Sequence, residues 1–270
     1  MTDPATKAPG GDPARPAAGA RPAGAMRPLA DARLAFQFLT RFPVGKGAPE
    51  GADLGRSCAW FPLAGATMGL VVAGAAWAAF GRMPAPLAGV LASAALAWMS
   101  GGLHLDGLAD LFDGLSGGHG DRERILAIMR DGRIGAHGAA ALVLVLLAKA
   151  AALAELVARG DPWILVAAPA VARFAAVPLV VYFPSARPEG LGKAFRGTAG
   201  PREVAVAALV AALAIAPSAP ASLASAAVAL AAAGALAVTV RRRLGGLTGD
   251  VYGAAIELAE VTFLSVAALR

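Results

Sequence analysis

Long runs of apolar residues constrain the fold of this chain more than any other feature of its sequence. They cover residues 57–80, 86–103, 137–158, 162–183, 203–217, 220–240 and 249–268. Most are close to the ~20 residues that a helix needs to cross a ~30 Å hydrocarbon core. Only 16% of the 270 residues are charged, whereas about a quarter are charged in a soluble domain. The sequence therefore predicts an all-α, polytopic integral membrane helix bundle with about seven spanning helices.

The N-terminal region has a different character. Residues 1–28 are rich in Pro, Ala and Gly and lack an apolar run, so we expect a disordered tail ahead of a membrane-embedded domain at 29–270. Residues 29–46 are expected to form an amphipathic interfacial helix that ends at Phe42-Pro43. Its Leu34, Phe38 and Phe42 are four residues apart and would place one apolar stripe on the membrane surface. In the first span, Gly65, Gly69 and Gly74 are expected to serve as helix-packing points.

The basic residues predict the orientation in the membrane. Of the 24 Lys and Arg residues, 19 fall in the tail and one alternate set of loops, three in the other set and two inside spans. By the positive-inside rule, the tail and residues 104–136, 184–202 and 241–248 face the cytoplasm. These loop charges also explain the pI near 10.2, so no nucleic-acid partner is expected. The single cysteine, Cys58, excludes an internal disulfide and fits a bacterial inner-membrane protein.

One polar stretch, from Gly101 to Gly138, interrupts the apolar chain. It holds every histidine of the sequence and six Asp or Glu residues. Asp106, Asp110 and Asp113 are spaced i, i+4, i+7 and so share one narrow face of a helix. Protonation or a bound cation would relieve their repulsion, and carboxylates without a nearby Cys favour Mg²⁺, Mn²⁺ or Ca²⁺ over zinc. The alternative is a solvated or helix-capping acidic face.

A second polar cluster occupies residues 241–260. Asp250 and Glu257 are seven residues apart and share a helix face. N-capping is the simpler interpretation of Thr248 and Asp250, but it does not explain Glu257 inside an apolar span. The Gly245-Gly246 pair, next to three arginines at 241–243, would let backbone amides approach a phosphate.

Three further ionisable residues lie within predicted spans, where such residues suggest function: Lys149 and Glu155 in the third and Arg173 in the fourth. Lys149 lies near mid-depth of its helix and is expected to pair with a carboxylate or to contact a substrate. The guanidinium of Arg173 suits a substrate phosphate. A buried ion pair with an Asp or Glu is the alternative role for this residue.

These residues together suggest a reaction class. Carboxylate-held Mg²⁺ beside arginines favours metal-assisted transfer on a phosphorylated substrate. A hydroxyl acceptor needs a base, for which His104, His137 or an unligated Asp would serve. His119, in a predicted loop, is the weakest candidate. An ion-coupled transporter is the rival class, although the acids cluster at one membrane face and no inverted repeat is evident.

Several motifs resemble one family. GGLHLDGLADLFDG followed by RILAIMRDGRIGAHG, FLTRFP at 38–43, WFPLAGATMG at 60–69 and LGGLTGDVYGAAIELAE at 244–260 resemble the cobalamin synthases, the adenosylcobinamide-GDP ribazoletransferases. The resemblance covers nearly everything after about residue 30. It implies a Mg²⁺-dependent inner-membrane enzyme that joins adenosylcobinamide-GDP to α-ribazole, or its 5′-phosphate, and releases GMP. The product is adenosylcobalamin or its 5′-phosphate, at the last stage of cobalamin biosynthesis.

The resemblance sharpens the expected roles. Asp106, Asp110 and Asp113 are expected to bind Mg²⁺, while Asp250 or Glu257 completes the site or orders a base. His104 or His137 is expected to handle the proton, with Asp113 as a further catalytic candidate. Phosphate or substrate contacts are expected from the basic residues Arg41, Arg130, Arg133 and Arg173. CDP-alcohol phosphotransferases are the alternative, but the chain departs from their Asp-Gly-x-x-Ala-Arg motif, because Asp106-Gly107-Leu108-Ala109 is followed by Asp110. Beyond the lipid bilayer, a homo-oligomer or a cobalamin-assembly complex is left open as partner.

Overall fold

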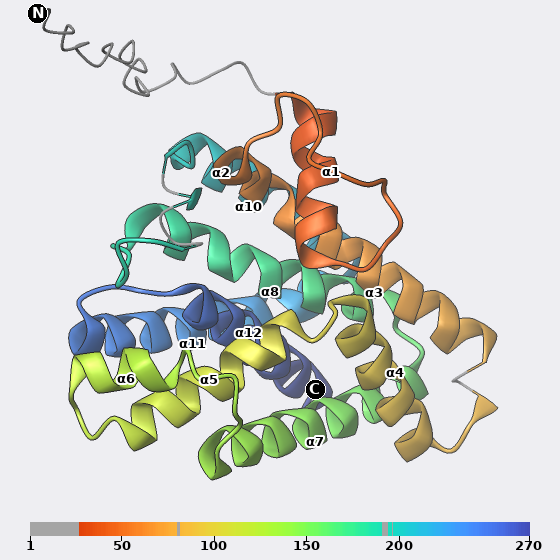
Figure 1. Ribbon diagram of the computed structural model, residues 1–270. Coiled ribbons are helices and arrows are strands. Elements are labelled where there is room, and N and C mark those ends of the chain that lie inside the picture. The colour runs from red at the N-terminus through yellow and green to blue at the C-terminus, as the bar shows by residue number, and fades with distance from the viewer. Residues whose placement is uncertain (1–26, 80–81, 191–193, 196) are drawn as a thin grey trace, which may run out of the picture.

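The chain forms a bundle of helices (Figure 1). The computed structural model describes residues 27–79, 82–190, 194–195 and 197–270, so the tail predicted at 1–28 lies almost wholly outside the described residues. The helices are α1 (Pro28–Leu39), α2 (Leu54–Ser57), α3 (Phe61–Ala78), α4 (Ala85–Met99), α5 (Leu103–Gly117), α6 (Arg122–Ile128), α7 (Ala136–Arg159), α8 (Pro162–Tyr182), α10 (Pro201–Ile215), α11 (Ala221–Leu244) and α12 (Gly249–Ala268).

The helices confirm a multi-pass membrane protein. Within the described residues, six are long and apolar enough to cross a bilayer, and the bent pair α4–α5 makes a seventh if it counts as one span. The first of them extends from Leu54 to Ala78, because α2 and a short 3₁₀ turn continue into α3. Arg241, Arg242 and Arg243 lie in the last turn of α11, one turn further along the helix than predicted, where cations offset the helix dipole.

The second predicted span, 86–103, is not one straight helix. α4 ends at Met99, and α5 leaves it at an angle of 92°. Gly101 and Gly102 cause this break, because both have positive φ (68° and 76°) and a left-handed residue cannot continue a right-handed helix. The bend turns α5, which carries the three aspartates, away from the direction of α4, and α5 packs against α7 and α12 (Figure 1).

The N-terminal helix is shorter than predicted. α1 ends at Leu39, and Thr40 is extended, so Phe42 lies outside the helical stripe. The backbone N–H of Arg41 donates to Met99 O at 2.8 Å instead of continuing the helix, and Pro43 restricts the residue before it. α1 is also tied to the bundle, because the buried Asp31 accepts from Arg56 Nε at 3.1 Å.

Helices α8 and α12 form the centre of the bundle. In the most apolar stretch of each helix, 83% of α8 and 67% of α12 is buried inside the protein. α12 packs against α5, α7, α8 and α11. α3 crosses α8 closely at Gly65 and Gly69, where an added Cβ would lie 2.2 and 2.5 Å from α8 carbonyl oxygens. These two glycines are confirmed as packing points, whereas Gly74 has no neighbour within 4 Å among the described residues.

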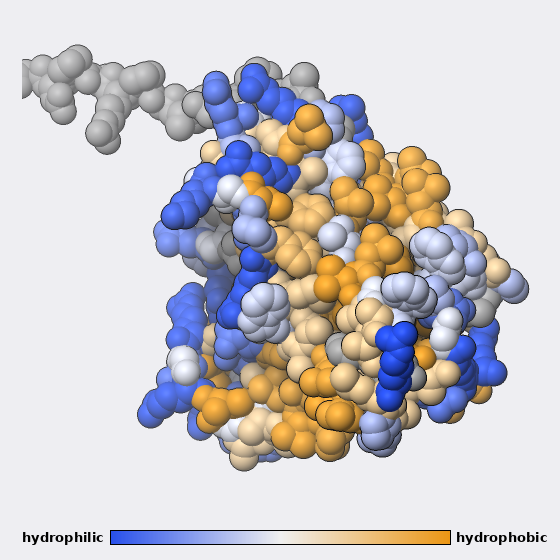
Figure 2. Space-filling view, turned by 90° about the vertical axis from the view of Figure 1, so that its right-hand side faces the viewer, coloured by the Kyte–Doolittle hydropathy of each residue, from blue (hydrophilic) through white to orange (hydrophobic). Residues whose placement is uncertain are grey.

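The outer surface carries the apolar side chains that a lipid-facing helix needs. Figure 2 shows them gathered over a broad part of one face, with hydrophilic residues mainly toward its edges. Large exposed apolar residues include Trp77 on α3, Trp98 on α4, and Leu144 and Leu147 on α7. Because a water-exposed surface rarely carries so many, this surface suits hydrocarbon.

Candidate active site

One pocket brings the polar motifs together. It lies between α1, α3, α5, α8 and α12. Its volume is ≈ 560 Å³ when the solvent-filled space at its opening is included. Four of the five quoted motifs contribute to its lining, namely Phe38 from FLTRFP, Phe61 from WFPLAGATMG, Asp106 from GGLHLDG and Asp250 from LTGDVYG, whereas RILAIMRDGRIGAHG does not. Segments separated by more than 200 residues therefore meet at one place, which is the strongest structural indication of a site.

Carboxylates from two helices converge beside this pocket. Asp106 and Asp110 lie on one face of α5, and Asp250 lies in the first turn of α12. The helices touch where Gly107 meets Asp250, because an added Cβ at Gly107 would be 2.7 Å from Asp250 O. Asp110 is partly buried and within electrostatic range of Asp106, Asp250 and Asp113. The site therefore carries an excess of negative charge that a cation would neutralise.

Asp250 does not act as a helix cap. Thr248 is the N-cap residue of α12, but its side chain caps no backbone N–H. Instead, the Thr248 hydroxyl donates to Asp250 Oδ2 at 3.1 Å. Arg187 Nη2 lies 3.4 Å from the same oxygen. Thr248 and Arg187 thus orient the carboxylate toward the α5 aspartates.

Arg187 is a site residue that the sequence did not reveal. It follows α8 in a loop that is tied to the α11–α12 connection, since Leu247 N–H donates to Pro184 O at 2.8 Å and Ala186 N–H donates to Leu247 O at 2.9 Å. Arg122 of α6 clamps the same region through Leu244 O and Ala186 O. Nothing in the spacing of a lone loop arginine predicts such a contact.

Asp113 contacts α7 and does not line the pocket. It accepts hydrogen bonds from the backbone N–H groups of Gly135 (2.7 Å) and Gly138 (2.8 Å) at the start of α7. It lines a separate surface hollow with Arg133 and His137. The predicted set of three aspartates is therefore divided along one face of α5: Asp106 lines the pocket, whereas Asp113, two turns further on, holds the N-terminus of α7.

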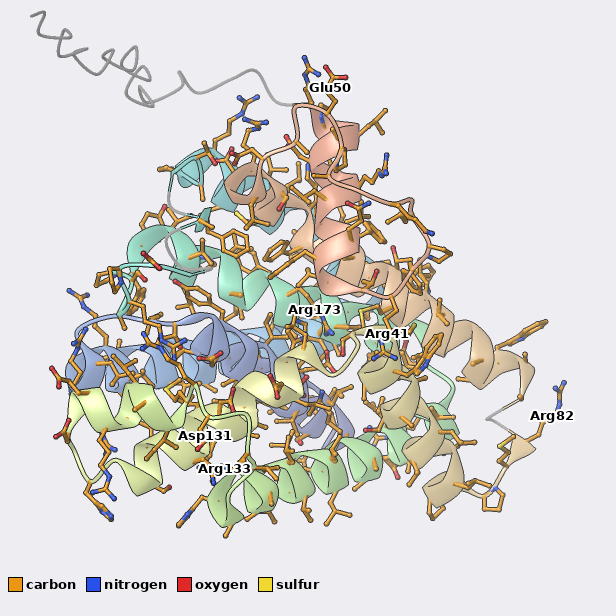
Figure 3. All side chains as sticks on the ribbon, in the orientation of Figure 1. Arg41, Glu50, Arg82, Asp131, Arg133 and Arg173 are labelled. Atoms are coloured by element: carbon orange, nitrogen blue, oxygen red, sulfur yellow. The ribbon has the colours of Figure 1, made fainter. Side chains whose placement is uncertain are left out.

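Three of the four predicted arginines, Arg41, Arg130 and Arg133, lie on the surface, and Arg173 is buried. The exposed Arg133 forms an ion pair with Asp131 at 2.5 Å, which lowers the pKa of the aspartate by hydrogen bonding. Figure 3 shows this pair on the loop before α7, far in the view from Arg173 at the centre of the bundle. Arg130 is exposed on the same loop. Arg41 lies beside the α4–α5 bend, with Nε 3.0 Å from where a Cβ of Gly101 would lie.

Arg173 and Glu257 belong to a buried ion network. Lys149 Nζ of α7 lies 2.6 Å from Glu257 Oε2 and 2.7 Å from Glu260 Oε1 of α12. Arg173 of α8 pairs with the other oxygen of Glu260. All four side chains are at most 5% exposed, and the two cations balance the two anions. The expected pairing of Lys149 with a carboxylate is confirmed.

No role was predicted for Glu260, although its position in the sequence indicates one. It lies three residues after Glu257, so both carboxylates share one face of α12. Two acids inside one apolar span need buried cations. Lys149 and Arg173 are the two basic residues within the predicted spans.

His104 lines the pocket and lies within electrostatic range of the buried ion network. Its side chain is 2% exposed and contributes to the pocket lining. Neither ring nitrogen has a hydrogen-bond partner among the described residues. Because a buried polar group without a partner is costly, this imidazole is a candidate to meet a substrate.

The Gly107 contact gives a first testable prediction. Gly107→Ala is expected to push α12 away from α5, because its Cβ would lie 2.7 and 2.9 Å from Asp250 O and Cα. The separation of Asp250 from Asp106 and Asp110 should lower turnover by about tenfold or more. Gly74→Ala is the matched control, since its Cβ would meet nothing within 4 Å. The measurement is the turnover of the purified variants in detergent. Equal rates for Gly107→Ala and Gly74→Ala would contradict the close contact between α5 and α12.

The donor set also suits Mg²⁺. Among the described residues, no three His, Cys, Asp or Glu side chains converge closely enough to ligate one ion alone. Mg²⁺ is usually held by one or two carboxylates, with waters and substrate phosphates completing its shell. Asp106, Asp110 and Asp250 supply carboxylates of this kind at the pocket.

Comparison with known proteins agrees with the motifs and the pocket. The family model for cobalamin-5-phosphate synthase matches residues 31–268. The adenosylcobinamide-GDP ribazoletransferase of Geotalea daltonii is 42% identical over 234 residues, 86% of this chain and 94% of that protein. That of Pseudomonas paraeruginosa is 44% identical over 238 residues, 87% and 96% of the two chains. No solved structure matches this chain. The chain belongs to the cobalamin-5-phosphate synthase family, whose curated relatives are adenosylcobinamide-GDP ribazoletransferases.

Proposed function

We propose that the chain transfers cobinamide-phosphate from adenosylcobinamide-GDP to α-ribazole, or to its 5′-phosphate, at the pocket between α5 and α12. GMP is released, and the product is adenosylcobalamin or its 5′-phosphate. The observation that carries the proposal is the pocket itself, to which Asp106, His104 and Asp250 contribute from two separate motifs. The family membership supplies the substrates that fit this chemistry.

The reaction exchanges one bond to phosphorus for another. A ribazole hydroxyl attacks the phosphorus that carries cobinamide, and the bond from that phosphorus to the GMP oxygen breaks. We assign the acceptance of the hydroxyl proton to His104, because it lines the pocket and neither ring nitrogen has a hydrogen-bond partner in the described part of the chain. Arg187 would leave Asp250 in part to contact the phosphates. His137, beside Asp113 in the second hollow, is less well placed.

The carboxylates would hold Mg²⁺ at this site. Asp106 and Asp110 of α5 and Asp250 of α12 are the candidate ligands we propose, of which one or two would bind the ion directly, and Asp113 serves as a support for α7. Bound Mg²⁺ would neutralise charge on the diphosphate and on the departing GMP. Arg173 and Glu257 act in the buried network and not on substrate.

We also propose that the pocket opens toward the cytoplasm. Residues 104–136 and 241–248, which flank it in sequence, belong to the set of segments with 19 of the 24 basic residues. Such segments stay on the cytoplasmic side. An inner-membrane location with a cytoplasmic active site follows.

GMP release tests the proposed function. Purified protein in detergent, given adenosylcobinamide-GDP and α-ribazole, is expected to release GMP only when both substrates and Mg²⁺ are present. EDTA should stop the release, and restored Mg²⁺ should recover it. Folded protein that releases no GMP under these conditions would favour the CDP-alcohol phosphotransferase or transporter alternatives.

A further inference from the structure

Three phenylalanine rings form one wall of the pocket, which we name the phenylalanine wall: Phe38, Phe61 and Phe195. Phe38 stacks on Phe61 with ring centroids 6.0 Å apart, and Phe195 meets both rings edge-on at 5.6 and 5.8 Å. All three rings contribute to the pocket lining. They come from α1, from the start of α3 and from the segment before α10, so the fold gathers them from distant parts of the chain.

Other apolar side chains line the pocket as well. They include Leu39, Ala176, Val180 and Ile256, and Asp106 and Asp250 belong to the same lining. The pocket therefore combines aromatic and aliphatic side chains with carboxylates. Such a site suits a ligand with a flat, apolar ring at one end and polar, reacting groups at the other.

We infer that the phenylalanine wall binds the aromatic base of the acceptor, the dimethylbenzimidazole of α-ribazole, and so sets which acceptor is used. This inference rests on the proposed function and names the part of the pocket that each half of the acceptor occupies. With its base against the wall, the ribose extends toward Asp106 and Asp250. That placement brings a ribose hydroxyl to the carboxylates that would hold the metal and the donor phosphates.

The other large groups of the two substrates suit this wall poorly. Guanine presents several hydrogen-bonding groups along its edges, and burial against Phe, Leu, Val and Ile would leave them without partners. The corrin ring is much wider and carries polar amide arms, so it fits an open face better than a recess. Dimethylbenzimidazole has two methyl groups and a single free ring nitrogen, and stacking of a base on aromatic rings is favourable.

Substitution of Phe38 tests the inference. Phe38 is only half-buried, so Phe38→Leu is expected to fold. The KM for α-ribazole should rise at least about fivefold, the lower end of what loss of one aromatic stacking partner costs. The KM for adenosylcobinamide-GDP and the rate at saturating acceptor should stay near wild type. Phe36→Leu is the matched control, because Phe36 lies on the same helix, pairs with Phe42 and does not contribute to the pocket lining.

An acceptor that lacks the benzo ring gives a second measurement. Wild-type protein should prefer α-ribazole to α-ribosylimidazole, and Phe38→Leu should reduce that preference while Phe36→Leu keeps it. An unchanged KM for α-ribazole, or an equal rise for both substrates, would overturn the inference. These outcomes are distinct from failure of the proposed function, in which wild-type protein itself releases no GMP.

Discussion

Asp110→Asn is expected to reduce GMP release by at least about 10²-fold, the usual cost of losing an electrostatic contact made in the transition state. The substitution keeps the size of the side chain and removes a charge that lies among Asp106, Asp250 and Asp113. Because one of four like charges is removed, the thermal stability should stay unchanged or rise. A loss of activity without a loss of stability would distinguish a role in the reaction from a role in folding.

The measurement is initial-rate GMP release at saturating substrates, with a thermal unfolding curve on the same preparation. Glu155→Gln is the control, since Glu155 is 54% exposed and forms an i, i+4 pair with Arg159 far from the pocket. It should keep full activity. Turnover near wild type in Asp110→Asn would remove this carboxylate from the metal site.

The largest effect on stability is expected from Lys149→Met. Loss of this cation leaves Glu257 and Glu260 buried with Arg173 as their remaining partner, and breaking a buried pair costs about 3–5 kcal/mol. The double variant Lys149→Met, Glu257→Gln balances the charges again, so it should recover most of the loss. Removal of the exposed Glu155–Arg159 pair should cost about 0.5 kcal/mol or less.

Thermal unfolding in detergent measures these differences. A coupling between positions 149 and 257 would appear as a double variant more stable than the Lys149→Met single variant. If Lys149→Met unfolds at the wild-type temperature, then the network is not buried from water and its proposed structural role is wrong. GMP release by the double variant shows in addition whether the network supports the site.

The lengths of the apolar runs predicted the spans well, because backbone groups in hydrocarbon must be satisfied within each helix. The run at 86–103 was the exception: hydropathy does not register the two glycines of positive φ that end α4 and turn α5. The predicted helix at 29–46 was also too long, because an apolar stripe cannot reveal that Arg41 N–H bonds to Met99 O across the bundle.

The residues of the candidate site were partly predictable. The helical spacing of Asp106 and Asp110 placed both on one face of α5, and the cluster at Asp250 proved to adjoin them. Spacing alone could not show that Asp113 turns to the amides of Gly135 and Gly138. It also could not tell that Arg173 pairs with Glu260 and Glu257 with Lys149, and that neither lines the pocket. These distinctions depend on tertiary packing between segments far apart in sequence.

The bend at Gly101-Gly102 has a consequence for the surrounding lipid. α4 has 15 residues and is therefore about 22 Å long, which is short of the ~30 Å hydrocarbon core. Lipid next to a short hydrophobic element is compressed, whereas carbonyl groups at the bend are satisfied within the protein, that of Met99 by the Arg41 N–H. We therefore expect the bilayer to be locally thinned next to α5. A bulky, amide-rich corrinoid would then reach the aspartates through hydrated headgroups without crossing acyl chains.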